Sequence, residues 1–173
     1  MVKEFRYEQH PQEVTSFNGP AVFLAGPTVR GNQQHLQPSW RFEAIEEFNR
    51  QGFDGAVIIP EFVSKTESDK AKPWIPEWEY NGLKRADAIL FWIPRTRELI
   101  GLTTNWELGY WMGKAPERVV YGRPDDAFRI DYLDIMWKST FNDSIFRTPK
   151  IQNTLQGTVE SSIEMANEWY PLR

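Results

Sequence analysis

Four short, mainly apolar runs, each ending in Pro or followed by Gly, divide the sequence at similar intervals. They occupy residues 21–25, 56–60, 89–94 and 118–121. Short runs rich in β-branched and aromatic residues are typical of strands that are buried on both faces of a parallel sheet. The stretches between them carry apolar residues at the spacing of amphipathic helices. This alternation predicts a mainly parallel sheet with helices on both faces and right-handed crossovers.

The expected fold is a single-domain, three-layer α/β sandwich with a flavodoxin-like (Rossmann-like) sheet of about five strands. A chain of 173 residues can bury one substantial core but is short for two domains. Residues 1–20 are polar and interrupted by Pro11, Gly19 and Pro20. We therefore expect an extended N-terminal arm over residues 1–20 and an α/β domain over residues 21–173.

Several helix boundaries follow from capping and breaking residues. Ser39 is expected to begin a helix that Gly52 ends, because Ser is a good N-cap and Gly a good terminator. Pro76 fits the first position of a second helix. Asp126 is expected to cap a third helix that includes Tyr132.

The overall charge and the residue counts narrow the classes of partner. The formal net charge is −4, which argues against a nucleic-acid polymer or an anionic membrane as the main partner and favours a small molecule. The chain has no cysteine, and its only histidines, His10 and His35, lie far apart, so we expect no bound metal. No apolar run approaches the length of a leader or a membrane span, so we expect a cytoplasmic protein without membrane contact.

Glu107 has two interpretations. If Thr104 begins a helix, Glu107 lies in the first turn, near exposed N–H groups and the positive end of the helix dipole, where a carboxylate stays ionised. The same spacing describes a capping box, in which Glu107 only bonds back to the backbone of Thr104. The three-residue spacing between Thr104 and Glu107 favours the capping box. Location favours a ligand site, because this segment leaves the carboxyl end of the strand at residues 89–94, where open α/β sheets bind ligands.

Three motifs resemble the nucleoside 2-deoxyribosyltransferase family, in its broader "-like" branch. They are residues 22–27, the pair 78–79 followed by 86–94, and residues 105–110, which contain Glu-Leu-Gly-Tyr. The resemblance covers about residues 21–135. It implies a small-molecule nucleoside or nucleotide and a free base as ligands, and no cofactor. It also implies a homo-oligomer, a dimer or larger, because the family completes its sites across subunits.

The resemblance assigns roles to individual residues. Glu107 takes the place of the nucleophilic glutamate, and Glu79 that of an acidic residue that protonates the leaving base. Glu79 also fits by topology, because the helix before a parallel strand starts at the edge where the strand ends. Asp87 would lie at the opposite edge, roughly 20 Å away at the usual strand rise, and is read as structural. The implied substrate-binding residues are Phe23, Gly26, Pro27, Thr28, Arg30, Trp40, Trp78, Thr103, Thr104 and Asn105.

The implied reaction is N-glycosyl transfer on (deoxy)nucleosides. Attack of Glu107 on the anomeric carbon would give a covalent glutamyl-sugar intermediate, and a second base would then displace Glu107 with net retention. Water in place of that base would give hydrolysis.

Two features of the sequence leave functions other than glycosyl transfer open. Residues 101–104 stand where the family usually has an aspartate shortly before the nucleophile, and Glu98 is the nearest acid. Residues 26–31 also look like the phosphate-holding loop of related nucleotide N-hydrolases, in which Arg30 would pair with a 5′-phosphate. A solvated surface arginine is the simpler account of Arg30. The alternatives are a 2′-deoxynucleoside 5′-phosphate N-glycosidase and a non-catalytic nucleotide-sensing module.

Overall fold

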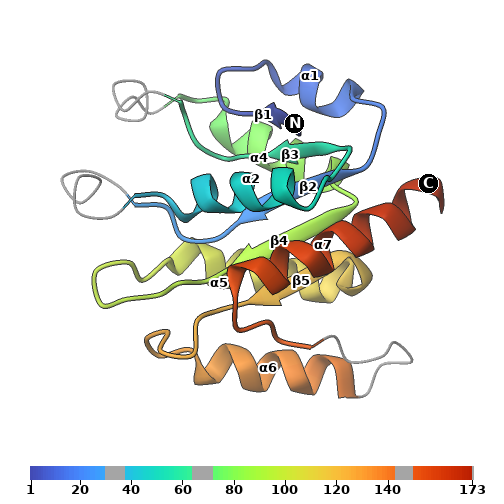
Figure 1. Cartoon of the computed structure of the whole chain (residues 1–173). Coiled ribbons are helices and arrows are strands. Elements are labelled where there is room, and N and C mark those ends of the chain that lie inside the picture. Colours follow the sequence, from blue (N-terminus) through green and yellow to red (C-terminus); the bar gives the residue numbers. More distant parts are fainter. Residues whose placement is uncertain (30–37, 64–71, 143–149, 173) are drawn as a thin grey trace.

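A computed structural model describes residues 1–29, 38–63, 72–142 and 150–172 of the chain (Figure 1). Five strands form one parallel sheet in the order β1-β3-β2-β4-β5. The strands are β1 (Lys3–Phe5), β2 (Ala21–Ala25), β3 (Ala56–Ile58), β4 (Ala88–Trp92) and β5 (Val119–Gly122). The α-helices are α1 (Pro11–Ser16), α2 (Trp40–Arg50), α4 (Ile75–Arg85), α5 (Leu102–Lys114), α6 (Asp131–Asn142) and α7 (Leu155–Trp169).

The helices cover both faces of the sheet, which confirms the predicted three-layer α/β architecture. Alternate strand residues point to opposite faces, so Phe23 belongs to one apolar cluster and its neighbour Leu24 to the other. Apolar residues of α1, α4, α5 and α6 join the first cluster, and those of α2 and α7 join the second. None of the helices described is long and apolar enough to cross a membrane.

The four strands predicted from the apolar runs have flavodoxin-like order, β3-β2-β4-β5. At its centre β2 pairs with β4, and Ala25 lies opposite Phe91 near their carboxyl ends. The helices that follow these two strands, α2 and α5, pack on opposite faces. The carboxyl ends of β2 and β4 therefore flank the switch point, where ligands bind in such sheets.

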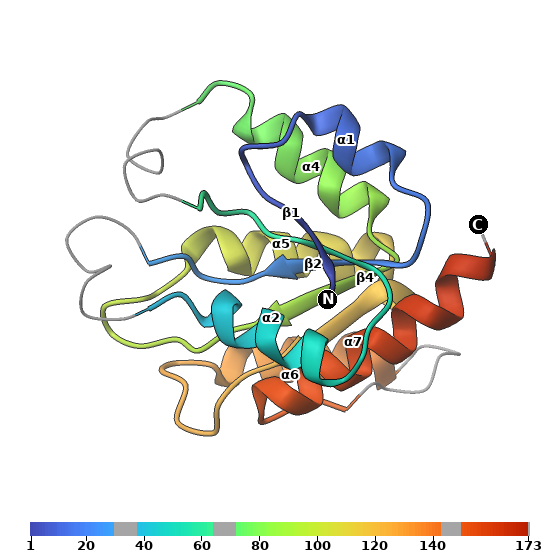
Figure 2. The same cartoon turned by 45° about the horizontal axis from the view of Figure 1, so that its top comes forward.

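The first 20 residues do not form an extended arm, contrary to the prediction. β1 pairs with β3, and α1 lies along α4 (Figure 2). His10 caps α1, so the following Pro11 occupies a position where proline favours a helix start. Burial of Phe5 and Val14 stabilises both elements against the rest of the core. A three-residue strand and a six-residue helix are too short to show a sequence period.

Helix starts were predicted with mixed accuracy. Ser39 caps α2 through a bond from the N–H of Arg41, as predicted. α4 begins at Ile75, one residue before Pro76. The assignment of Asp126 as a cap was wrong, because α6 begins at Asp131. Arg129 has a φ of 49°, a left-handed conformation that prevents the helix from extending further back.

Candidate functional site

A cavity of about 450 Å³ opens at the carboxyl edge of the sheet. Its walls come from the end of β2 and the loop after it, the loop between β4 and α5, and the side of α4. Seven lining residues were predicted as catalytic or substrate-binding: Phe23, Gly26, Pro27, Thr28, Glu79, Thr103 and Glu107. The loop that contains Gly26 and the helix that carries Glu107 therefore face the same cavity.

The two predicted catalytic acids share this cavity. Glu107 comes from α5 and Glu79 from α4, and both side chains are half-buried. The cavity also contains Glu98, which is exposed at its rim. Three carboxyl groups therefore surround one cavity, where negative charge can stabilise a positively charged group.

The helix that carries Glu107 starts earlier than predicted. Gly101 is its N-cap residue, and no side chain caps it. Thr104 is the third helical residue and is only 1% exposed, so its assignment as the N-cap was wrong. Glu107 then lies in the second turn, beyond the region where the helix dipole acts strongly. This position excludes the Thr104–Glu107 capping box and also weakens the dipole argument for an ionised Glu107.

Two glycines allow the loops of the site to approach closely. A Cβ on Gly26 would lie 2.3 Å from the carbonyl oxygen of Trp92, so the chain there passes against the end of β4. Gly101 has a φ of 64°, and its Cβ would lie 2.8 Å from the Cβ of Pro27. Side chains at either position would push the two loops apart and deform the cavity between them.

Arg41 is a lining residue that the sequence did not reveal. Its guanidinium group is almost fully buried and holds the loop after β2 by donating to the carbonyl oxygens of Leu24, at 3.1 Å, and Gly26, at 2.9 Å. It also donates to the hydroxyl of Thr28 at 3.2 Å and forms an ion pair of 2.7 Å with Glu61. An arginine within a polar helical stretch gives no signal that it will point inward.

Four predicted substrate-binding residues are not among those lining the cavity. Trp78 is fully buried and donates its indole N–H to the Gln9 carbonyl oxygen at 3.1 Å, so it is a core residue and not a wall for a base. Trp40 donates in the same way to Pro27 at 3.1 Å and packs behind Gly26. The other two are Thr104, which is buried, and Asn105.

Asn105 is engaged by a second buried arginine. Arg95, which follows β4, donates to the side-chain oxygen of Asn105 and, at 3.2 Å, to the carbonyl oxygen of Arg129. Burial lowers the pKa of the Arg95 guanidinium, and its Nε has no partner among the described residues. The loop between β4 and α5 is thus fixed from inside the protein, away from the cavity.

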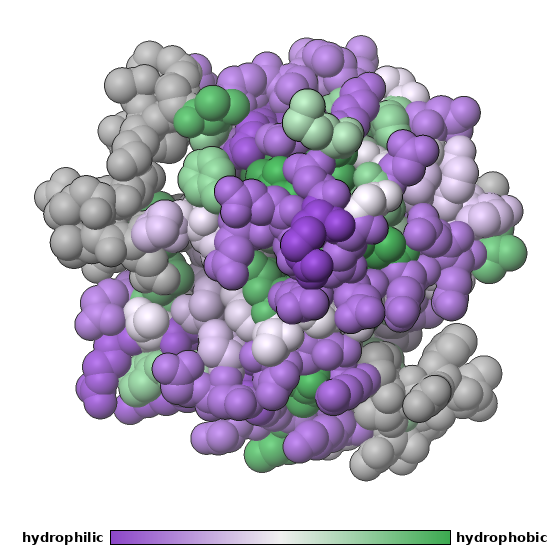
Figure 3. All heavy atoms as spheres, in the orientation of Figure 1, coloured by the Kyte–Doolittle hydropathy of each residue, from purple (hydrophilic) through white to green (hydrophobic). Residues whose placement is uncertain are grey.

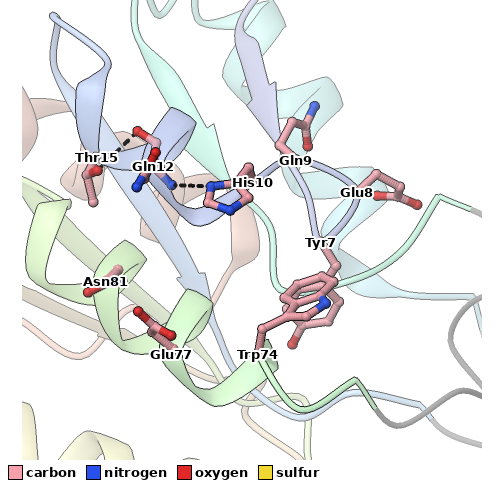
Figure 4. A pocket seen from close by; sticks show the side chains of 9 residues that line it. All are labelled: Tyr7, Glu8, Gln9, His10, Gln12, Thr15, Trp74, Glu77 and Asn81. Carbon is pink, nitrogen blue, oxygen red and sulfur yellow. Dashed lines mark hydrogen bonds between the residues drawn. The ribbon is translucent and has the colours of Figure 1, made fainter.

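A second cavity, of about 510 Å³, lies between α1 and the start of α4 (Figure 4). Its lining includes Tyr7, His10, Trp74 and Glu77, and none of the predicted site residues. It lies away from the switch point between β2 and β4, so the smaller cavity is the better candidate for the active site. A hydrogen bond connects the two linings, because the Tyr7 hydroxyl at the second cavity donates to Glu79, which lines the first.

The remaining predictions concern Arg30 and metals. Arg30 lies outside the residues that the structure describes, and so does His35. Across the described ranges, no group of three or more His, Cys, Asp or Glu side chains is arranged to hold a metal ion.

Comparison with known proteins gives one family match. Residues 19–125 match the model of the family described as nucleoside 2-deoxyribosyltransferase like. The matched span contains all three acids that line the cavity, Glu79, Glu98 and Glu107, and excludes β1, α1, α6 and α7. No curated protein matches the chain.

Proposed function

Because the chain belongs to the nucleoside 2-deoxyribosyltransferase-like family, we propose that it moves a deoxyribosyl group between nucleobases, with Glu107 as the nucleophile. The observation that carries this proposal is the shared cavity. Glu107 and Glu79 come from two helices and line one pocket at the switch point of the sheet. Family membership supports glycosyl transfer, and the specific reaction is our proposal.

The proposed reaction has two displacements. The Glu107 carboxylate attacks C1′ of the nucleoside while the bond from C1′ to the base nitrogen breaks, and the base leaves with the bonding electrons and a proton from Glu79. A second base then attacks C1′ of the glutamyl-sugar ester. Glu107 is released as a carboxylate, and Glu79 recovers a proton from the incoming base. Both atoms and charges balance, and neither a metal nor a cofactor is required.

The charge of the cavity suits this chemistry. Transition states for cleavage of a glycosidic bond resemble an oxocarbenium ion, which carries positive charge near C1′. Glu98 and Glu107 line the cavity, and Glu79 beside them becomes a carboxylate as it gives its proton to the base, whereas the positive charge of Arg41 is paired with Glu61. A volume of about 450 Å³ lies within the roughly 300–1,000 Å³ that is usual for small-molecule sites.

A panel of nucleosides and nucleoside monophosphates, incubated with and without a second free base, tests the proposal. Transfer predicts a new nucleoside that forms only when the second base is present. Release of free base without any new nucleoside would instead indicate a hydrolase. Ligand-induced thermal stabilisation without product would indicate a nucleotide-sensing module and contradict the proposed function.

The panel needs a control for nonspecific loss of charge. Glu160→Gln removes a carboxylate from the exposed face of α7, far in sequence from the cavity residues. This variant should keep the product pattern and rate of the wild-type protein.

A further inference from the structure

We infer that Tyr7, from the segment between β1 and α1, positions the carboxyl group of Glu79 for proton transfer to the leaving base. This inference rests on the proposed function. The Tyr7 hydroxyl donates a hydrogen bond to Oε1 of Glu79. Across the described residues, no other group bonds to the Glu79 side chain. The orientation of this carboxyl group therefore depends on Tyr7.

The ring of Tyr7 is held firmly enough to serve as a support. It is 9% exposed and packs against three aromatic rings, with centroid distances of 4.9 Å to Phe62, 5.1 Å to Trp78 and 6.4 Å to Trp74. Figure 4 shows the Tyr7 and Trp74 rings together at one end of the second cavity. Trp78 also anchors the backbone that follows Tyr7 through its bond to the Gln9 carbonyl oxygen. The hydroxyl therefore meets Glu79 from a fixed direction.

This contact determines which oxygen of Glu79 carries the proton. A hydroxyl that donates to Oε1 makes this atom the acceptor, so the proton of the neutral acid resides on Oε2. Oε2 can then pass the proton to the base nitrogen as the bond to C1′ breaks. The same hydroxyl stabilises the carboxylate that remains, because hydrogen bonds to an ionised acceptor are stronger than those to a neutral one.

Tyr7 lies outside the span that matches the family. The match begins at residue 19, so β1 and α1 are additions to the matched core in this chain. The proposed acid belongs to the matched core, and its hydrogen-bond donor belongs to the added segment. The N-terminal segment would thus contribute to catalysis as well as extend the sheet.

Tyr7→Phe tests this role because it keeps the ring and removes only the hydroxyl. With an ordinary purine nucleoside we expect kcat to fall about tenfold to a hundredfold, a part of the usual contribution of a general acid, while KM changes less than about threefold. An N7-methylated purine nucleoside already carries a positive charge on its base, so the base can leave without a proton. For that substrate we expect a change in kcat of less than about threefold.

Tyr121→Phe is the matched control. Tyr121 is also a buried tyrosine whose hydroxyl donates to a carboxylate, at 2.8 Å to Asp134, but neither residue lines the cavity. This variant should show wild-type kcat with both substrates. A double variant of Tyr7→Phe and Glu79→Gln should be no slower than Glu79→Gln alone, because both changes affect one proton transfer.

The possible failures are distinguishable. Equal losses of kcat on both substrates in Tyr7→Phe would show a merely structural role and overturn the inference. An additive loss in the double variant would do the same. A wild-type protein that turned over neither substrate would instead overturn the proposed function, and the role of Tyr7 with it. If Tyr7→Phe did not fold, Tyr7→Met, which also removes the hydroxyl and keeps an apolar side chain at this buried position, should give the same substrate dependence.

Discussion

At the scale of single residues, Glu107 carries the proposed chemistry, and its position in α5 sharpens the experiment that tests it. The sequence alone allowed Glu107 to be either a nucleophile or the partner of a Thr104 cap. Because the helix begins at Leu102, the cap is excluded, and replacing Glu107 removes no capping interaction. A loss of activity in a Glu107 variant therefore cannot be attributed to the loss of a helix cap.

We predict that Glu107→Gln lowers kcat/KM about a thousandfold or more, because the amide cannot form the covalent intermediate. The substitution keeps the size of the side chain, so the thermal midpoint should be close to that of the wild type. A fluorinated deoxynucleoside analogue should add its sugar mass to the wild-type peptide that contains Glu107 and leave the variant unlabelled. Retained turnover in the variant would contradict the mechanism.

Gly101 and Gly109 form a matched pair for testing the loop geometry. Gly101 has a φ of 64°, and an added Cβ would meet Pro27, whereas an added Cβ on Gly109 meets nothing within 4 Å. We predict that Gly101→Ala lowers the free energy of unfolding by about 1–3 kcal/mol, because the left-handed conformation strains an alanine. Gly109→Ala should raise it by about 0.5–1 kcal/mol, because alanine is the better helix former. Urea unfolding measures both. Equal effects would show that the conformation of Gly101 is not required.

At the scale of elements, long apolar patterns were predictable and short or context-dependent features were not. Four of the five strands follow from runs of apolar residues that are buried on both faces. β1 and α1 escaped prediction because each is short and owes its stability to contacts with distant elements. The start of α5 was misplaced because a buried threonine resembles a cap in sequence, and only tertiary contacts show that Gly101 takes this place.

The candidate site was predictable to a similar degree. Gly26, Pro27 and Thr28 after β2 line one cavity with Thr103 and Glu107 of α5, because parallel strands bring the segments that follow them to one edge. Arg41 was missed because its partners, the carbonyl groups of one loop and Glu61 of another, become neighbours only in the folded chain. Trp78 was wrongly assigned to the substrate site, because the sequence does not show whether a large ring near the start of a helix points into the core or towards a ligand.

Arg41 connects α2 to the two loops beside it, so its replacement should affect stability strongly. We predict that Arg41→Met lowers the free energy of unfolding by about 3–5 kcal/mol, because it leaves Glu61, whose side chain is 12% exposed, without its ion-pair partner. Adding Glu61→Gln should recover part of this loss. Denaturant titration of the single and double variants measures the coupling between the two residues.

The same helix offers a control for Arg41. Arg50 forms an ion pair with Glu47 at 2.6 Å, but its side chain is 60% exposed. Arg50→Met should change stability little, because water screens exposed pairs. Similar losses in Arg41→Met and Arg50→Met would show that burial does not determine the strength of the Arg41 contact.

At the scale of the whole molecule, apolar side chains are unevenly distributed over the surface. The face that carries α2 and α7 is mostly hydrophilic, with hydrophobic side chains scattered singly (Figure 3). In contrast, α5 and α6 contact each other, and each exposes several large apolar side chains. The exposed fractions are 75% for Leu102, 70% for Trp106, 70% for Tyr132 and 60% for Ile135. Such a concentration is typical of a surface that another protein covers.

We predict that the protein is a homo-oligomer and that its subunits meet through α5 and α6. Light scattering at micromolar concentration should then give a multiple of the 20.3 kDa chain mass. Combining Trp106→Lys with Ile135→Lys should shift the mass towards that of one chain, because charged residues are costly at the centre of an interface. Phe42→Lys, which replaces a 52% exposed side chain on α2, should leave the mass unchanged. A wild-type mass near that of one chain would contradict oligomer formation, whereas an unchanged mass in the double lysine variant would place the contact elsewhere.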